Sequence, residues 1–145
     1  MSKASELDQK LRDCLERITP SNGFGTEFRK VFEEDDPIPD KQAMPYLVAR
    51  VDTDRRTSNA ITQATRVRTY QIEAVFSHRT PRAELNAAGV DVLRAMGIGR
   101  FDAEHRVPGL IEDEDQMVFV NPAGKGITTR SLFITVGVTY AEDYN

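Results

Sequence analysis

The feature that most constrains the fold is a long alternation of apolar and mostly polar or small side chains near the C-terminus. The apolar set is Leu132, Ile134, Val136, Val138 and Tyr140. A two-residue period of this length predicts a strand with one buried face. A strand cannot bury that face alone, so the sequence predicts a sheet covered on one side by another layer.

Four further segments are predicted to be strands from their aromatic and β-branched content. They span residues 27–33, 46–52, 66–77 and 117–120. The polar stretch 53–65 is expected to join the second and third strands as a hairpin with a long arm, and 121–126 to form the turn of a second hairpin. The spacing of Phe24, Phe28 and Phe32 also fits a helix, but the preceding glycines favour a strand.

Two helices are predicted from apolar side chains at helical spacing. The first carries Leu7, Leu11, Cys14, Leu15 and Ile18, with Ser2 or Ser5 as its cap. The second is expected to use Thr80 as N-cap and Pro81 as first residue, and to bury Leu85, Ala88, Val92 and Met96. The prediction is therefore one α+β domain over residues 1–145, with the order α-β-β-β-α-β-β. Its mainly antiparallel sheet of about five strands has both helices on one face.

Composition excludes several classes of protein. The 145 residues carry a formal charge of −4, which argues against a protein whose main role is to coat nucleic acid. No apolar run approaches the roughly 18 to 20 residues of a membrane span, and the N-terminus lacks the apolar segment of a signal peptide. We therefore expect folding in a cytoplasm, with no membrane partner.

No combination of residues predicts catalysis. Cys14 lies in the apolar stripe of the first helix and is interpreted as an inert buried thiol, while His78 and His105 are isolated and interpreted as surface residues. The sequence Gly124-Lys125-Gly126 lacks the rest of a phosphate-binding loop and is interpreted as a turn. We predict a protein that is not an enzyme, with no cofactor and no metal.

Charge is unevenly distributed along the chain. A basic group falls in or beside the first hairpin, whose arm is placed at about 50–68: Arg50, Arg55, Arg56, Arg66 and Arg68. Two acidic runs fall in predicted loops. The first is Glu33, Glu34, Asp35 and Asp36, and the second is Glu112, Asp113, Glu114 and Asp115. A basic arm and acidic loops suit head-to-tail association of identical subunits, so the arginines are candidate subunit contacts. The alternatives are an arm that is merely solvated and, if the acidic runs come together, a small hydrolase with a carboxylate-bound metal.

The chain as a whole resembles the tail terminator proteins of long-tailed bacteriophages, also called tail completion or minor tail proteins. The resemblance spans nearly the full length and rests on an architectural pattern. Its parts are the opening helix 7–18, the segment 23–32 (GFGTEFRKVF) with its acidic loop, the segment 45–51 (PYLVARV), the strand 68–76, the helix after Pro81, and the closing strand 130–140 with its polar tail.

This resemblance implies a structural subunit of the virion tail, located at the neck and present in the host cytoplasm during assembly. It implies a homo-oligomeric ring, expected to be a hexamer, that ends polymerisation of the tail tube and provides the attachment surface for the neck. The implied partners are the tail tube protein, the connector proteins of the neck, and genomic DNA that passes through the lumen without specific binding. We expect the acidic runs to face the lumen or an adjoining ring. A neck or head-completion connector protein is the nearest alternative.

Overall fold

The computed structural model describes residues 1–99, 103–122 and 124–145, without the side chains of residues 103 and 111–115. Its order of helices and strands is the predicted α-β-β-β-α-β-β, with two short 3-10 turns. The bounds are α1 Lys3–Glu16, η1 Pro20–Asn22, β1 Val31–Glu33, β2 Tyr46–Asn59, β3 Gln63–Ser77, α2 Arg82–Ala95, η2 Ala103–His105, β4 Leu110–Val120 and β5 Thr129–Asp143.

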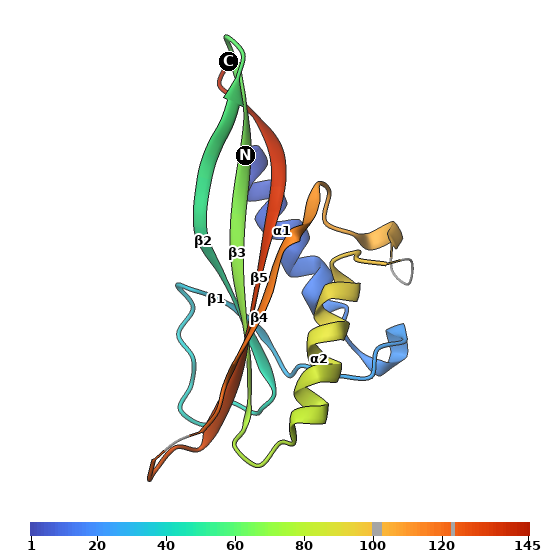
Figure 1. Ribbon diagram of the computed structural model, residues 1–145, viewed down its shortest axis with the longest axis vertical. Helices are drawn as coiled ribbons and strands as arrows, with labels where there is room; N and C mark the ends of the chain where they lie inside the picture. The colour runs from blue at the N-terminus through green and yellow to red at the C-terminus, as the bar shows by residue number, and fades with distance from the viewer. Residues whose placement is uncertain (100–102, 123) are drawn as a thin grey trace.

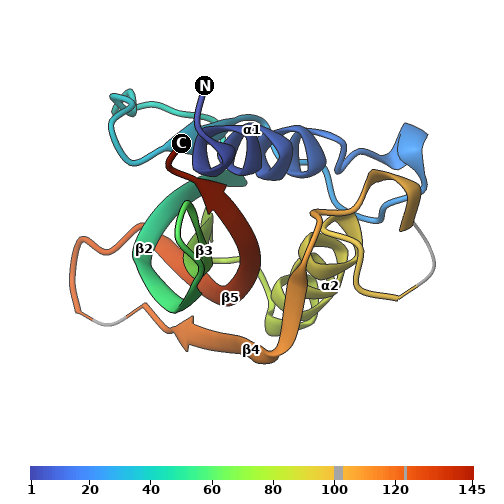
Figure 2. The same cartoon turned by 90° about the horizontal axis from the view of Figure 1, so that it is seen from above.

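The five strands form one sheet with the spatial order β1-β2-β3-β5-β4. Strand β1 runs parallel to β2, and the other neighbours are antiparallel, so the fold is α+β with a mainly antiparallel sheet, as predicted. Figure 1 shows the long strands β2, β3 and β5 side by side, and Figure 2 shows how strongly this sheet curls. The strong twist follows from the handedness of long strands and from two bulges in β2.

The core lies between one face of the sheet and the two helices. The predicted apolar side chains of β5 from Leu132 to Val138 are fully buried, and Tyr140 packs at the margin of the core. The stripes of both helices are buried as predicted, including Cys14 at 1% exposure. Ser2 caps α1, since its side chain accepts a hydrogen bond from the backbone N–H of Ser5.

The first predicted strand is wrong in its length. Strand β1 has only three residues, because the chain before it is irregular and its phenylalanines face different ways. Phe24 is buried in the main core, and Phe28 packs edge-on against Phe76. Phe32 pairs in register with Val48 on the opposite face of the sheet, where it contacts Tyr46. The spacing of the three phenylalanines therefore does not mark one strand face.

The polar stretch 53–65 is not the long connection between two strands that the sequence predicts. Most of it belongs to β2 and β3, which leaves only residues 60–62 as the turn. Polar side chains are tolerated in this strand pair because ion pairs, described below, neutralise several of the charges. The second helix begins one residue later than predicted, with Pro81 at the N-cap and no side-chain capping bond from Thr80.

The acidic residues Glu112, Asp113, Glu114 and Asp115 were expected in a loop, but their backbone lies inside β4. The register of β4 against β5 shifts between Ile111 and Gln116, so the acidic run occupies an irregular part of the strand. The strand consequently begins at Leu110 and not at Met117. The side chains of this run lie outside the described part of the structure.

Candidate functional site

The most distinctive part of the molecule is the β arm, defined as residues 50–68 of the hairpin β2-β3. It extends beyond the helices to the top of Figure 1. The end of β5 supports it, since Gln63–Val67 pair with Thr139–Asp143. In the described residues, β1 pairs with β2 only at Leu47–Ala49, so the outer edge of β2 along the arm has no strand beside it.

Asp54 holds the two strands of the arm and β5 together. It accepts a hydrogen bond from Arg66 Nε at 2.5 Å and another from Arg68 Nη1 at 2.8 Å. The hydroxyl of Tyr140 on β5 also donates to Asp54. Burial by itself raises the pKa of this carboxyl, but the three hydrogen bonds outweigh burial and hold its pKa below the ordinary value. Burial, followed by the hydrogen bond to Asp54, raises the pKa of Tyr140 to about 12.

A second carboxylate connects the arm to the helix layer. Asp8 on α1 accepts hydrogen bonds from Arg68 Nε at 2.8 Å and Arg68 Nη2 at 2.9 Å. It also accepts a hydrogen bond from the hydroxyl of Tyr70 at 2.5 Å. Burial is the main reason, and the Asp8 bond the second, that the pKa of Tyr70 lies far above its ordinary value. The arm is therefore fixed to α1 by charge-assisted hydrogen bonds at its base.

The candidate contact arginines fall into two groups. Arg66 and Arg68 belong to the network just described, and Arg50 forms an ion pair with Glu73 at 2.9 Å. These three contribute to the arm's own structure. Arg55 and Arg56 are exposed on the outer part of β2. Within residues 50–68 the only acidic residues in the sequence are Asp52 and Asp54, so a local count of charges misses Asp8, a helix residue 60 positions from Arg68.

The two acidic runs lie far apart in the sheet. Glu33 ends β1, where it pairs with Arg12 at 3.2 Å, and Glu34, Asp35 and Asp36 form the turn that follows. The other run lies in β4. Strands β1 and β4 are the two opposite edges of the sheet, so one copy of the chain does not bring the runs together. Within the described residues, no cluster of three or more His, Cys, Asp or Glu side chains could hold a metal ion.

Cys14 and His105 contact each other inside the fold, and His78 lies at the surface. The thiol of Cys14 donates to the backbone carbonyl of His105 at 2.6 Å, which ties α1 to η2. The sequence places both histidines at the surface. His78 is exposed just after β3, as interpreted, whereas His105 is half-buried. No helix in the described part of the chain combines the length and apolarity needed to cross a bilayer.

Comparison with known proteins assigns no family. No protein-family model matches the chain, and no curated protein sequence is detectably similar to it. One solved structure aligns over 94% of both chains with 11% sequence identity and a TM-score of 0.44. That score is too low to carry an argument about fold or function.

Proposed function

We propose that this chain is a structural subunit of a bacteriophage tail. Copies of it assemble into a ring at the head-proximal end of the tail tube, where the ring ends tube polymerisation and offers an attachment surface to the neck. The subunit is present in the host cytoplasm during assembly and in the neck region of the virion afterwards. The sequence pattern that resembles tail terminator proteins supplies the biological setting of this proposal.

The single observation that carries the proposal is the outer edge of β2 along the arm, which pairs with no strand among the described residues. An exposed strand edge presents backbone N–H and C=O groups to which another strand can bind. Charged side chains line this edge, including exposed Arg55 and Arg56, and charges discourage indiscriminate pairing. An edge of this kind favours a specific partner of complementary charge, such as an acidic surface of an identical subunit.

The rigidity of the arm supports the same function. A flexible hairpin would lose conformational entropy on assembly, whereas an arm already fixed by Asp54 and Asp8 loses less. The negative formal charge of the chain also suits a ring around DNA, because like charges disfavour stable contact with phosphates.

The proposal is tested by analytical ultracentrifugation of the purified chain and by negative-stain microscopy of the same sample with isolated tail tubes. We expect closed rings, and labelled protein bound at one end of tubes that carry no head. Binding to heads that lack tails, with no binding to tubes, would indicate a neck or head-completion connector instead. A chain that stays monomeric both alone and with tubes would contradict the proposal.

A further inference from the structure

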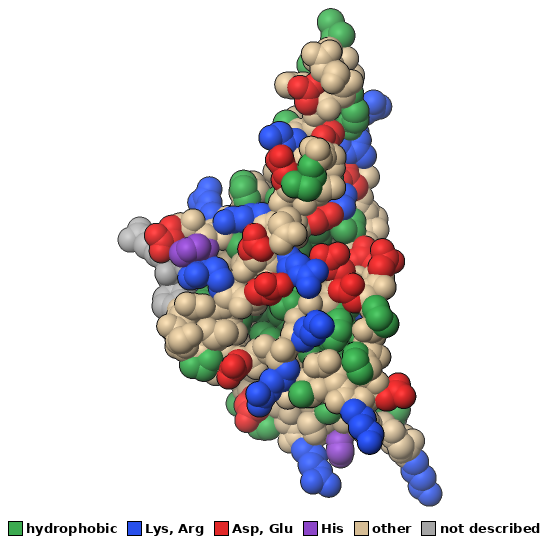
Figure 3. All heavy atoms as spheres, turned by 180° about the vertical axis from the view of Figure 1, so that it is seen from behind, with side chains coloured by type: hydrophobic (Ala, Val, Ile, Leu, Met, Phe, Trp, Pro, Cys, Tyr) green, Lys and Arg blue, Asp and Glu red, His purple; other side chains and the backbone are tan. Residues whose placement is uncertain are grey.

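The β arm ends in a fully exposed apolar side chain. Ile61 lies at the turn between β2 and β3 and has 103% relative exposure. Figure 3 shows a hydrophobic side chain at the extreme end of the arm. Hairpin turns ordinarily favour glycine, asparagine or aspartate, because these residues adopt the backbone angles of tight turns and none of them exposes a large apolar side chain to water. An isoleucine at the most prominent point of the molecule is therefore unusual and favours burial against another surface.

The backbone of the exposed tip also has N–H groups that a partner surface could bind. Ala60 N–H closes the turn by donating to the carbonyl of Gln63 at 2.8 Å. The N–H groups of Ile61 and Thr62 donate to no acceptor within the described ranges. A surface that suits this tip needs an apolar hollow with hydrogen-bond acceptors around it.

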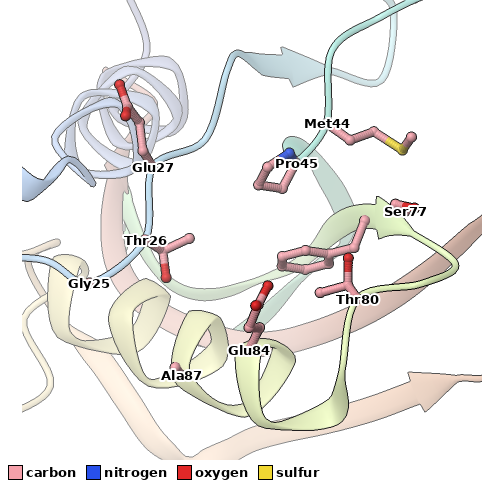
Figure 4. A pocket seen from close by; sticks show the side chains of 10 residues that line it. Gly25, Thr26, Glu27, Met44, Pro45, Ser77, Thr80, Glu84 and Ala87 are labelled. Atoms are coloured by element: carbon pink, nitrogen blue, oxygen red, sulfur yellow. The ribbon is translucent and has the colours of Figure 1, made fainter.

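A pocket at the other end of the hairpin has this character. Its volume is about 410 Å³, and its apolar lining comes from Met44, Pro45, Phe76 and Ala87. Its polar lining includes the Thr26 and Thr80 hydroxyls and the Glu84 carboxylate, all of which can accept hydrogen bonds. Figure 4 shows Glu84 pointing from α2 into the pocket, with Pro45 and Met44 on the opposite wall, while Glu27 points away from it.

The tip and the pocket cannot meet within one molecule. Pro45 immediately precedes β2, and Ile61 follows the far end of that strand. At about 3.3 Å per residue, the strand separates them by roughly 45 Å. One such contact leaves each copy with a free tip or a free pocket, so its repetition produces a ring or a filament, unless two copies pair reciprocally as a dimer.

We propose that Ile61 of one copy inserts into the pocket between Pro45 and α2 of a second copy. This inference rests on the proposed function, since a ring-forming chain needs two complementary surfaces, and it names those surfaces. A comparably large pocket beside the arm is lined by Lys3, Lys10 and one carboxylate, Glu6, which pairs with Lys3. It fits less well, because its net charge is positive like that of the arginines behind the tip. The carboxylate of Glu84 complements those arginines, and none of the described residues that line its pocket is basic.

The test uses two variants of the full chain, each altered on one side of the contact. Ile61→Asp removes the apolar tip, and Ala87→Phe fills the pocket from an exposed position on α2. We expect each change to weaken self-association at least about tenfold in analytical ultracentrifugation. The matched control is Ile127→Asp, which alters another exposed isoleucine in a hairpin turn and should leave association unchanged. Circular dichroism verifies that all three variants remain folded.

A mixture of the two variants gives the sharpest result. The Ala87→Phe copy keeps its tip and the Ile61→Asp copy keeps its pocket, so an equimolar mixture should form a complex of two copies and nothing larger. Recovery of full-size assemblies from the mixture, or normal association of either variant alone, would overturn the inference while leaving ring formation intact. A monomeric wild-type chain would overturn the inference and the proposed function together. Rings that fail to bind tail tubes would overturn only the proposed function.

Discussion

Arg68 on β3 and Asp8 on α1 face each other with two parallel hydrogen bonds, of 2.8 and 2.9 Å, between guanidinium and carboxylate. This fork geometry is specific to arginine and fixes both side chains in orientation as well as distance. The side chain of Arg68 is only 15% exposed, so the pair is less screened by water than an ordinary surface ion pair. The pair connects α1 to the base of the β arm.

Asp8→Ala should therefore destabilise the fold by about 2 kcal/mol, because it leaves Arg68 with one carboxylate and the Tyr70 hydroxyl without its acceptor. Urea unfolding followed by circular dichroism measures the change. The matched control is Asp13→Ala on the same helix, where an exposed carboxylate accepts a hydrogen bond from Gln9. That change should stay within about 0.5 kcal/mol of wild type. Equal effects of the two substitutions would contradict a structural role for the Asp8 pair.

The low pKa of Asp54 predicts a pH-dependent contribution to stability. A carboxyl whose pKa is lower in the folded state binds fewer protons there than in the unfolded chain, so it stabilises the fold above the unfolded pKa of about 4. This contribution is lost as pH falls from about 5 through the folded pKa. Asp54→Asn should lower stability by about 1 to 2 kcal/mol at pH 7 and by progressively less towards pH 3.

The measurement is the difference in unfolding free energy between wild type and Asp54→Asn in urea at several pH values. Taking the difference removes the titration of carboxyls that both proteins share. A difference that stays constant from pH 7 to pH 3 would show that the ionised form of Asp54 is not the one stabilised by Arg66, Arg68 and Tyr140.

Much of the fold follows from patterns that are local in sequence. The alternation from Leu132 to Val138 and the stripe from Leu7 to Ile18 each report one buried face, because the helix and the strand repeat their side-chain directions regularly. Segments outside helices and strands have no such repeat of side-chain direction. Phe24 and Phe32 are both buried, but on opposite faces of the sheet. The segment between them crosses from one layer to the other, so it has no repeat that predicts which face each side chain takes.

The candidate site was predicted less well for a related reason. Counting charges along residues 50–68 describes the arm as basic, but the fold brings Asp8 from α1 to Arg68 and Glu73 from β3 to Arg50. The helix contact depends on tertiary packing, which one sequence does not reveal. The length of the arm was not predicted either, because its exposed polar residues lack the apolar alternation by which a half-buried strand is recognised.

The backbone at Gly109 leaves no room for a side chain. Its φ is +75°, and an added Cβ would lie 2.1 Å from the carbonyl oxygen of Thr139 on β5. Gly109→Ala should therefore cost at least about 3 kcal/mol of unfolding free energy, from left-handed strain and from displacement of β5. Gly124→Ala is the control, since its φ is +89° with no atom within 4 Å of the added Cβ, and it should cost about 1 kcal/mol. Similar costs at both positions would show that strain alone matters at Gly109.

The exposed arginines of the arm provide the test of its role in assembly. The double substitution Arg55→Glu and Arg56→Glu leaves the Asp54 and Asp8 network intact, so the monomer should remain folded. Ring formation should weaken by at least about tenfold, because the reversed charges would repel an acidic partner surface.

Lys41→Glu with Lys125→Glu is the control, since it changes the net charge by the same amount at exposed positions away from the arm. Sedimentation at two salt concentrations separates the effects: a loss caused by complementary charge should be larger at low salt. Normal rings with both arginines reversed would contradict the assignment of the arm as a subunit contact.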